Sequence, residues 1–320
     1  MEFKQLEAFV HVAELGGFTR AAAILGIGQP VVSRLVRQLE VELRHTLLER
    51  NGRGVTLTPA GQCLLAHAQG LLQQMQRAVQ DLDDLHGSPG GHFSIGVIPS
   101  FGRVAALELV RHFRTTFPQA TISVTQGLST YLGEWLAMGR IDVAVMYDFE
   151  TPLIDKRVLY TEDLYLIGPD NGPSGPSGPS SGTRAKRPPP TLTLREMADY
   201  PLIIPSRMHT IRHMLDATAS KLGIKFNVAI EMDTVTSILD LVAEGAGYGV
   251  LTLNAIESDA LKRNFRAIRV TKPTLRSRLV LATSRAHPLS RLATQAIAML
   301  EADIIPLYDR ASARGGKRQP

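Results

Sequence analysis

Apolar side chains near the start of the chain recur at steps of three and four, the spacing that places them on one face of a helix. This pattern predicts helices from Phe3 onward, over 18–25 and from Pro30 onward. Gly26 closes the second helix, because glycine commonly follows a helix end, and Pro30 suits a first helical position, where its missing N–H loses no hydrogen bond. Two short helices joined by so tight a turn indicate a helix-turn-helix.

The helix that begins near Pro30 has two chemically different faces. Val32, Leu39 and Leu43 belong to an apolar stripe that packs on a core. The opposite face carries Gln29, Pro30, Ser33, Arg34 and Arg37. Glutamine, serine and arginine side chains read base edges and hold phosphates in the major groove, so this face predicts a DNA-recognition helix. An ordinary amphipathic helix pair is the alternative interpretation.

A short hairpin is expected directly after these helices. Residues 47–58 alternate around a turn at Asn51 and Gly52, which is a strong hairpin signal. Arg50 and Arg53 flank that turn, where a cation reaches phosphates or a narrow minor groove. The sequence therefore predicts a winged helix-turn-helix DNA-binding domain over residues 1–58.

A long helix follows, capped by Thr58 before Pro59. Its apolar positions alternate in steps of four and three: Leu64, Ala68, Leu71, Met75, Ala78, Leu82 and Leu85. A stripe this narrow usually packs against another helix of the same kind, so we expect a dimerisation helix, with burial against the C-terminal part as the alternative. Glycines at 87–91 then form a hinge, which gives a linker segment over 59–90.

From residue 91 onward, short apolar runs alternate with helical segments. Strands are predicted over 93–98, 121–125, 141–146, 164–167, 202–204, 228–232 and 248–253, with helices at 102–117, 129–139, 209–222, 234–244 and 288–302. This alternation indicates an α/β effector-binding domain over 91–310 with a mostly parallel sheet. Such sheets bind ligands at the carboxyl ends of their strands, beside helix N-termini that favour anions.

Hydroxyl side chains fall at that expected edge. Ser100, Ser129 and Ser206 each follow a predicted strand and precede a helix. A plain helix cap explains any one of them, whereas three at equivalent edges favour a shared cleft. Arg103, Arg207 and Arg212 lie nearby and favour a carboxylate effector, although arginines at such places are more often solvated.

Two segments cannot form a core. Residues 169–190 contain repeated Gly-Pro-Ser and a basic run, and residues 311–320 are a polar tail, so both are expected to be disordered. Lysine and arginine total 35 against 30 acidic residues, a net charge of +5 that only weakly favours anionic partners. The chain has no signal-peptide pattern and no long apolar run, so we expect a cytoplasmic protein without a membrane partner.

The sequence contains no recognisable catalytic or metal-binding constellation. The glycines over 245–249 lead from a helix into a strand, the reverse of a dinucleotide-binding turn. His209 and His213 share a helix face but lack a third ligand, and the single Cys63 excludes an internal disulfide and a cysteine-rich zinc site. No nucleophile-elbow serine and no phosphate-loop motif is present, so no cofactor, metal or enzymatic activity is predicted.

The N-terminal pattern resembles the DNA-binding domain of LysR-type transcriptional regulators, through LEAFV, GGFTRAAAILGI, QPVVSRLVRQLEVEL, LLER and RGVTLTPAG. A looser likeness continues in HFSIGVIPS, IDVAVMY, EDLYLIGP and LVAEGAGYGVLTLNAI, with a weak hint of the nitrogen-assimilation-control branch. Gly28 stands where the family usually has serine, which removes the usual side-chain cap of the recognition helix. Leu48 stands where the family usually has phenylalanine.

The resemblance implies DNA contacts at Gln29, Ser33 and Arg34, with Arg53 in the wing. It also implies two Rossmann-like subdomains of the periplasmic-binding-protein type with an effector cleft between them. By position, the cleft residues are Ser100, Phe101, Ser129, Tyr147, Ser206 and Thr252. A homodimer or homotetramer that binds double-stranded DNA, a small-molecule effector and RNA polymerase is expected. The rival interpretation is a small-molecule binding protein or enzyme whose N-terminal helices serve only for assembly.

Overall fold

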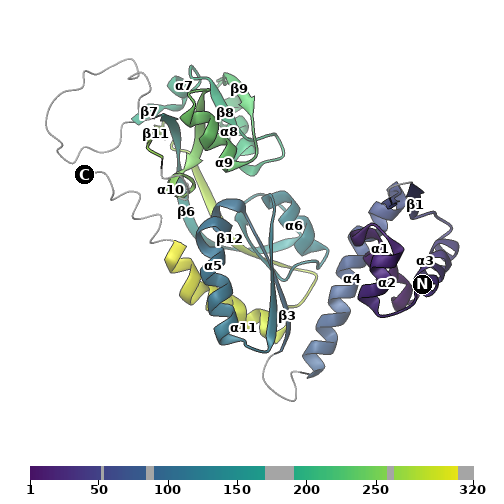
Figure 1. Ribbon diagram of the computed structural model, residues 1–320. Helices are drawn as coiled ribbons and strands as arrows, with labels where there is room; N and C mark the ends of the chain where they lie inside the picture. The colour runs from purple at the N-terminus through teal and green to yellow at the C-terminus, as the bar shows by residue number, and fades with distance from the viewer. Residues whose placement is uncertain (52–53, 84–89, 170–190, 258–262, 309–320) are drawn as a thin grey trace.

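The computed structural model describes residues 1–51, 54–83, 90–169, 191–257 and 263–308 (Figure 1). An N-terminal helical unit, one long helix and a two-lobed α/β body follow one another along the chain. Within these ranges, no helix is long and apolar enough to span a membrane. The predicted segments at 169–190 and 311–320 lie wholly or mostly outside the described residues, as do Arg53, Leu85 and Gly87 of the predicted hinge.

The N-terminal unit contains the three predicted helices, α1 (Phe3–Leu15), α2 (Phe18–Leu25) and α3 (Gln29–Leu43). Fully buried side chains that include Phe9, Val32 and Leu39 form its core. Gly26 ends α2 in the left-handed conformation, with φ of 64°, and Pro30 lies in the first turn of α3. The helix-turn-helix pattern is therefore confirmed, and no side chain caps α3 at Gly28.

The hairpin packs at the end of this unit as strands β1 (Leu48–Asn51) and β2 (Gly54–Leu57), paired antiparallel. Glu40 of α3 fixes the start of the hairpin, because its Oε1 atom accepts hydrogen bonds from the backbone N–H groups of Leu47 and Leu48 at 2.8 and 3.1 Å. Asn51, expected in the turn, instead ends the first strand, where it pairs with Gly54.

The long helix α4 (Pro59–Asp83) begins at the predicted cap, where Thr58 Oγ1 accepts the N–H of Gly61 at 3.0 Å. Its first turns pack against α1, and Ala68 is fully buried there. Beyond this point the predicted apolar stripe is open to solvent: Leu71 is 49% exposed, Met75 47% and Leu82 63%. In the single chain, the stripe is thus covered only at its N-terminal end.

A second face of α4 rests on the α/β body. Gln73 Nε2 donates to Ser94 Oγ at 2.6 Å, and Gln74 Nε2 lies 2.6 Å from Nδ1 of His287. Gly70 approaches so closely that a Cβ atom there would lie 1.8 Å from the carbonyl oxygen of Met138. The two interpretations of this helix, an open dimerisation stripe and burial against the C-terminal part, therefore concern different faces of it.

Lobe I contains the parallel strands β3 (Gly91–Val97), β4 (Ala120–Gln126) and β5 (Val143–Tyr147) in the order β4-β3-β5. The antiparallel strand β12 (Arg276–Ser284) extends this sheet beside β5. Its helices are α5 (Pro99–Thr116), α6 (Ser129–Ala137) and α11 (Arg291–Met299), the last continued by a π-helical turn over Leu300–Ile304.

Lobe II repeats this plan with the parallel strands β10 (Tyr248–Thr252), β8 (Leu202–Ile204) and β9 (Val228–Glu231). Two further strands are β7 (Thr191–Thr193) and β11 (Phe265–Thr271). Its helices are α7 (Leu194–Met197), α8 (Thr210–Lys221), α9 (Val235–Ala243) and α10 (Leu253–Glu257).

One long strand, β6 (Ile154–Pro169), joins the lobes (Figure 1). Its first part pairs with β12, and its last residues pair with β10 and β11. All these pairings are antiparallel, whereas the three-stranded core of each lobe, and β7 with β11, pair in parallel as expected. The run predicted at 164–167 is the lobe II end of this strand.

Candidate functional site

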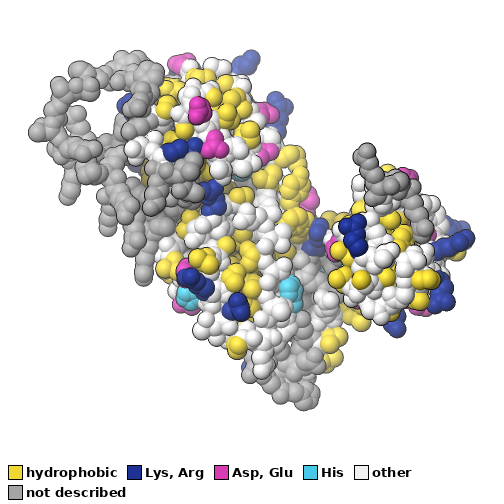
Figure 2. Space-filling model, in the orientation of Figure 1, with side chains coloured by type: hydrophobic (Ala, Val, Ile, Leu, Met, Phe, Trp, Pro, Cys, Tyr) yellow, Lys and Arg dark blue, Asp and Glu magenta, His cyan; other side chains and the backbone are white. Residues whose placement is uncertain are grey.

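The polar face of α3 is exposed in the structure. Pro30, Arg34 and Arg37 are exposed, Gln29 and Ser33 are half-buried, and the opposite face is buried. Within the described ranges, neither Arg34 nor Arg37 has an ion-pair partner, and α3 has no acidic residue before Glu40. Figure 2 shows basic side chains gathered where α3 lies on the N-terminal unit. This face offers cations and hydrogen-bonding groups on a rigid helix.

The main chain of Arg50 pairs with Val55 in the hairpin, and Arg53 lies outside the described residues. Gly61 seats α4 against the hairpin, because a Cβ atom there would lie 2.1 Å from the carbonyl oxygen of Leu47. The hairpin is thus fixed to the same rigid unit as α3.

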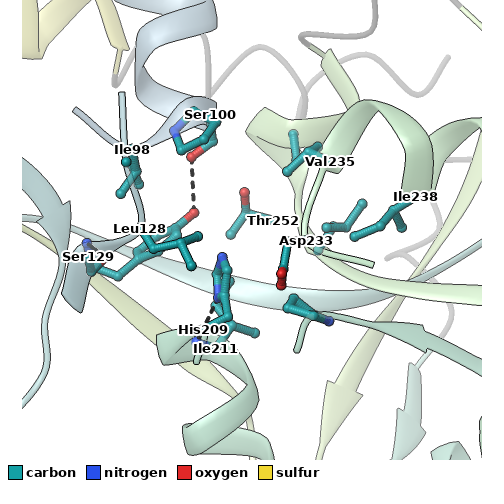
Figure 3. Close-up of a pocket in the computed structure, with 16 residues that line it drawn as sticks. Ile98, Ser100, Leu128, Ser129, His209, Ile211, Asp233, Val235, Ile238 and Thr252 are labelled. Atoms are coloured by element: carbon teal, nitrogen blue, oxygen red, sulfur yellow. Dashed lines mark hydrogen bonds between the residues drawn. The ribbon is translucent and has the colours of Figure 1, made fainter. Parts of the chain in front are cut away.

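A cleft lies between the two lobes, at the carboxyl ends of the parallel strands (Figure 3). Its enclosed cavity measures only about 30 Å³, and the non-atom space of about 540 Å³ in and around it includes open solvent. Helices α5 and α6 begin at its lobe I wall, and α8 and α9 begin at its lobe II wall. Four of the six predicted cleft residues line it, namely Ser100, Ser129, Tyr147 and Thr252.

Tyr147 forms the floor of the cleft. Its hydroxyl lies 3.3 Å from Ser100 Oγ, and its backbone N–H donates to Ser129 Oγ at 3.0 Å. Burial raises the pKa of Tyr147 well above its usual range, and the nearby Glu162 carboxyl adds to this rise. The phenol is therefore neutral and remains available as a hydrogen-bond donor or acceptor.

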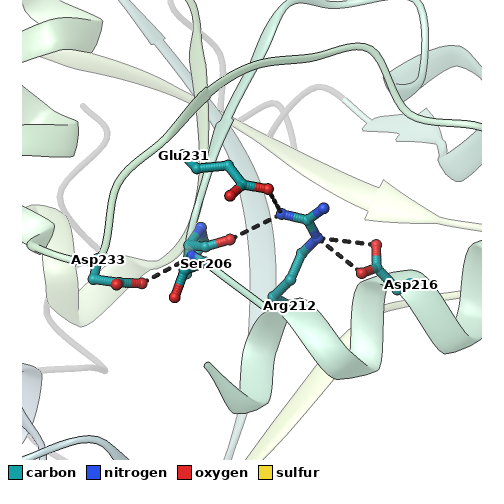
Figure 4. Close-up of polar contacts among 6 residues, drawn as sticks. Ser206, Arg212, Asp216, Glu231 and Asp233 are labelled. Atoms are coloured by element: carbon teal, nitrogen blue, oxygen red, sulfur yellow. Dashed lines mark hydrogen bonds and ion pairs between the residues drawn. The ribbon is translucent and has the colours of Figure 1, made fainter. Parts of the chain in front are cut away.

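His209 and Asp233 also face this space, and the sequence reasoning assigned neither to the cleft (Figure 3). His209 Nδ1 accepts the N–H of Ile211 at 3.2 Å, so its Nε2 atom carries the proton of the neutral ring. Burial lowers the pKa of His209, which keeps the ring neutral. Asp233 follows β9, and its Oδ1 accepts the N–H of Ser206 at 2.8 Å (Figure 4).

The other two predicted cleft residues lie elsewhere. Phe101 is fully buried in the core, where its ring packs on Tyr308 with centroids 5.0 Å apart, because α5 turns this position away from the cleft. Ser206 is held at the edge by Asp233 and does not line the cavity. Arg212 is buried on the outer side of lobe II, where it binds Asp216 and Glu231 (Figure 4).

A buried carboxyl lies behind the floor, on β6 at the junction of the lobes. Glu162 Oε1 accepts Asn254 Nδ2 at 2.7 Å and the Tyr308 hydroxyl at 3.4 Å. Burial raises the pKa of Glu162 to about 7, although these two hydrogen bonds oppose the rise. Glu162 thus connects lobe I, lobe II and the end of the described chain in one polar cluster.

Family models cover both parts of the chain. Residues 3–62 match the model described as bacterial regulatory helix-turn-helix protein, lysR family, and residues 86–304 match the LysR substrate binding domain. The chain belongs to the LysR family of transcriptional regulators.

Relatives of this LysR-family regulator carry regulatory names. The nitrogen assimilation regulatory protein nac of Escherichia coli is 29% identical over 278 residues, which is 86% of each chain. The regulator BbuR of Bordetella bronchiseptica is 29% identical over 255 residues, 79% of this chain and 75% of that protein. The family consists of regulators and not of enzymes, so the rival enzymatic interpretation is set aside.

Solved structures share the fold of this LysR-family protein. Full-length OxyR from Pseudomonas aeruginosa aligns with a TM-score of 0.68 at 22% identity, over 95% of this chain and 94% of that one. CbnR in complex with its target DNA aligns with a TM-score of 0.63 at 23% identity, over 98% and 100% of the two chains. Both likenesses confirm the two-part architecture of a helix-turn-helix and an α/β body.

Proposed function

We propose that this regulator binds one specific DNA sequence through α3, with the wing beside it on the backbone. The observation that supports this most directly is the exposed, acid-free face of Gln29, Ser33, Arg34 and Arg37 on a helix whose opposite face is buried. Arginine and glutamine read base edges in the major groove, and we expect Arg50 and Arg53 of the wing to contact phosphates.

The functional unit is at least a dimer. The exposed stripe of Leu71, Met75 and Leu82 on α4 has the spacing of a helix-to-helix seam. One recognition helix reads only a few base pairs, and a two-fold dimer doubles the length of the recognised site. A homodimer or a homotetramer satisfies this requirement, and contact with RNA polymerase completes the expected set of macromolecular partners. Since its target is DNA, we place the protein in the cytoplasm with the chromosome.

The inter-lobe cleft holds a small-molecule effector that controls DNA binding. Its walls belong to different lobes, so an effector that prefers one arrangement of the lobes changes the population of that arrangement. Helix α4 packs on lobe I through contacts with Ser94, Met138 and His287, which we call the α4 docking contacts. A movement of lobe I is therefore transmitted to the N-terminal unit of the same chain and to the spacing of paired recognition helices.

Selection of bound duplexes from a random DNA pool tests this proposal. The wild-type chain is expected to enrich a sequence with two-fold symmetry. Arg34→Ala is expected to weaken binding to that sequence by about tenfold to hundredfold and to relax the preference at one base pair of each half-site. Arg114→Ala, on the exposed surface of α5, is the matched control and leaves binding unchanged. Enrichment of no sequence, or an Arg34→Ala variant equal to wild type, contradicts the proposal.

A further inference from the structure

Two valines of α3 take no part in the core of the N-terminal unit. The other aliphatic side chains of this helix are either buried in that core or packed against it from partly buried positions. Val31 and Val41 belong to neither group, and they are 36% and 70% exposed. A branched side chain also lowers helix propensity slightly. Packing and helix stability therefore account for neither valine.

The surroundings of these two valines differ in charge. Val31 lies in the first turn of α3, three residues before the exposed Arg34, and no acidic residue of the helix precedes Glu40. Val41 lies near the other end of the helix, between Glu40 and Glu42. Carboxylates disfavour the approach of DNA phosphates. Of the two exposed valines, only Val31 therefore lies on the part of α3 that is suited to contact DNA.

The major groove of DNA limits what a valine can recognise there. Every base pair presents hydrogen-bonding atoms in this groove, and the C5-methyl group of thymine is its apolar feature. Valine has no side-chain donor or acceptor, so it leaves a polar base edge without a partner when it covers one. A valine on a recognition helix therefore fits the methyl group of thymine and disfavours the amino group of cytosine at the same position.

We propose that Val31 packs against the C5-methyl group of one thymine in each half-site and selects thymine at that position. This inference rests on the proposed reading of DNA by α3 and names a further residue that determines its sequence preference. Residues three apart on a helix have Cβ atoms about 5–6 Å apart, and one base pair rises about 3.4 Å. The thymine is therefore expected one or two base pairs from the base that Arg34 reads.

Two parallel selections from random duplex pools test the methyl contact. One pool is made with thymidine and the other with deoxyuridine, which differs from thymidine only in lacking the C5-methyl group. The full-length wild-type chain is expected to enrich a thymine at one position of each half-site from the first pool. In the deoxyuridine pool, the preference at that position should weaken while the other positions keep theirs.

Equal preference at every position in both pools overturns the proposal. Enrichment of no sequence from either pool is a different result: it contradicts the proposed DNA recognition by α3, and this assignment with it. The two selections therefore distinguish a failure of the methyl contact from a failure of the regulator mechanism.

Affinity measurements on the selected duplex assign the methyl group to one side chain. Deoxyuridine in place of the selected thymine is expected to weaken wild-type binding by about threefold to tenfold, since burial of one methyl group has an effect of this size. Val31→Ala removes both methyl groups of the valine, so this variant should distinguish the two duplexes by less than about twofold. Val41→Ala makes the same change on the same helix and is the matched control, which keeps the wild-type discrimination.

A Val31→Ala variant that discriminates as the wild type does contradicts the assignment, because another side chain then contacts the methyl group. Melting curves of the same samples show whether each variant is folded. Both valines are exposed and alanine favours a helix over valine, so neither substitution is expected to lower the melting temperature. A change in discrimination without a change in melting temperature therefore reports the contact with DNA.

Discussion

Replacement of Gly70 by alanine tests the α4 docking contacts, which join the DNA-binding unit to the effector-binding body within one chain. The added Cβ atom would lie 1.8 Å from the carbonyl oxygen of Met138. Ordinary contact begins at 3.4 Å, so α4 must move away from lobe I by roughly 1.6 Å. Such a movement stretches the contacts of Gln73 with Ser94 and of Gln74 with His287, both now 2.6 Å long, beyond hydrogen-bonding distance.

The size of the effect follows from what is lost. Two side-chain hydrogen bonds contribute about 1 kcal/mol each, and the contact around Gly70 adds dispersion energy, so the docked arrangement loses roughly 2 to 3 kcal/mol. Alanine favours a helix over glycine by about 1 kcal/mol, so α4 itself is stabilised. The substitution is therefore expected to undock the helix without unfolding it, and to lower the equilibrium constant for docking by about 30-fold to 160-fold.

Small-angle X-ray scattering measures this directly, because undocking of the N-terminal unit raises the radius of gyration. Gly90→Ala makes the same chemical change between α4 and β3, where a Cβ atom meets nothing within 4 Å, and serves as the control. We expect a larger radius and faster proteolysis of the linker for Gly70→Ala only, with the helical content preserved. Scattering and proteolysis identical to those of the wild type would refute the docking of α4 on lobe I.

Three further predictions concern the linker stripe, the hinge carboxyl and the wing. Leu71→Glu combined with Met75→Glu places like charges on the exposed stripe of α4, so sedimentation should show a shift toward monomer, and an unchanged mass would exclude this stripe from the interface. The pKa of Glu162 is raised from 4.5 to about 7, so the folded chain keeps a proton that the unfolded chain has lost. The free energy of unfolding should therefore fall between about pH 4.5 and pH 7, by at most about 3 kcal/mol, and Glu162→Gln should flatten this fall in denaturant titrations; an equally steep fall contradicts it. Gly61→Ala forces a Cβ atom to within 2.1 Å of the Leu47 carbonyl oxygen, so calorimetry should show a lower melting temperature and DNA affinity should decrease; unchanged values contradict the close packing.

Local patterns in the sequence predict most of the elements because each pattern has its own physical cause. The steps of three and four, Gly26 and Pro30 act within one or two helical turns, so α2 and α3 are found with their ends nearly in place. The strand over 202–204 is found because it is a buried aliphatic run between turn signals. Thr58 is found as a cap because a hydroxyl before a helix satisfies a free N–H group.

The lobe junction is missed because its strands have mixed surroundings. β6 changes partner midway, from β12 to β10 and β11, so its sixteen residues show no single period of burial. β12 begins with alternating arginines and β11 is only partly buried, and neither is a compact apolar run. The antiparallel pairings at the junction depend on contacts far apart in the sequence.

The cleft residues also depend partly on contacts far apart in the sequence, which local patterns do not reveal. Thr252 ends β10, and Ser100 and Ser129 lie in the first helical turns after β3 and β4, so strand order alone brings them to one edge. Whether Phe101 faces the cleft or the core depends on the orientation of the first turn of α5. In the structure it faces the core, where its ring packs on Tyr308. Asp233 and His209 precede helices as capping residues do, so only the approach of the two lobes reveals their shared cavity. The position of Asp233 just after a strand was the available signal.

The central claim is that two copies of the chain read one DNA site through α3. The most direct measurement is a footprint of the full-length protein on a duplex carrying the selected sequence, at two salt concentrations and with a scrambled duplex as competitor. We predict two protected half-sites related by two-fold symmetry, about ten base pairs or a multiple of that apart, that survive the competitor and weaken at high salt. A single unpaired half-site, or protection that the scrambled duplex removes, would contradict the account.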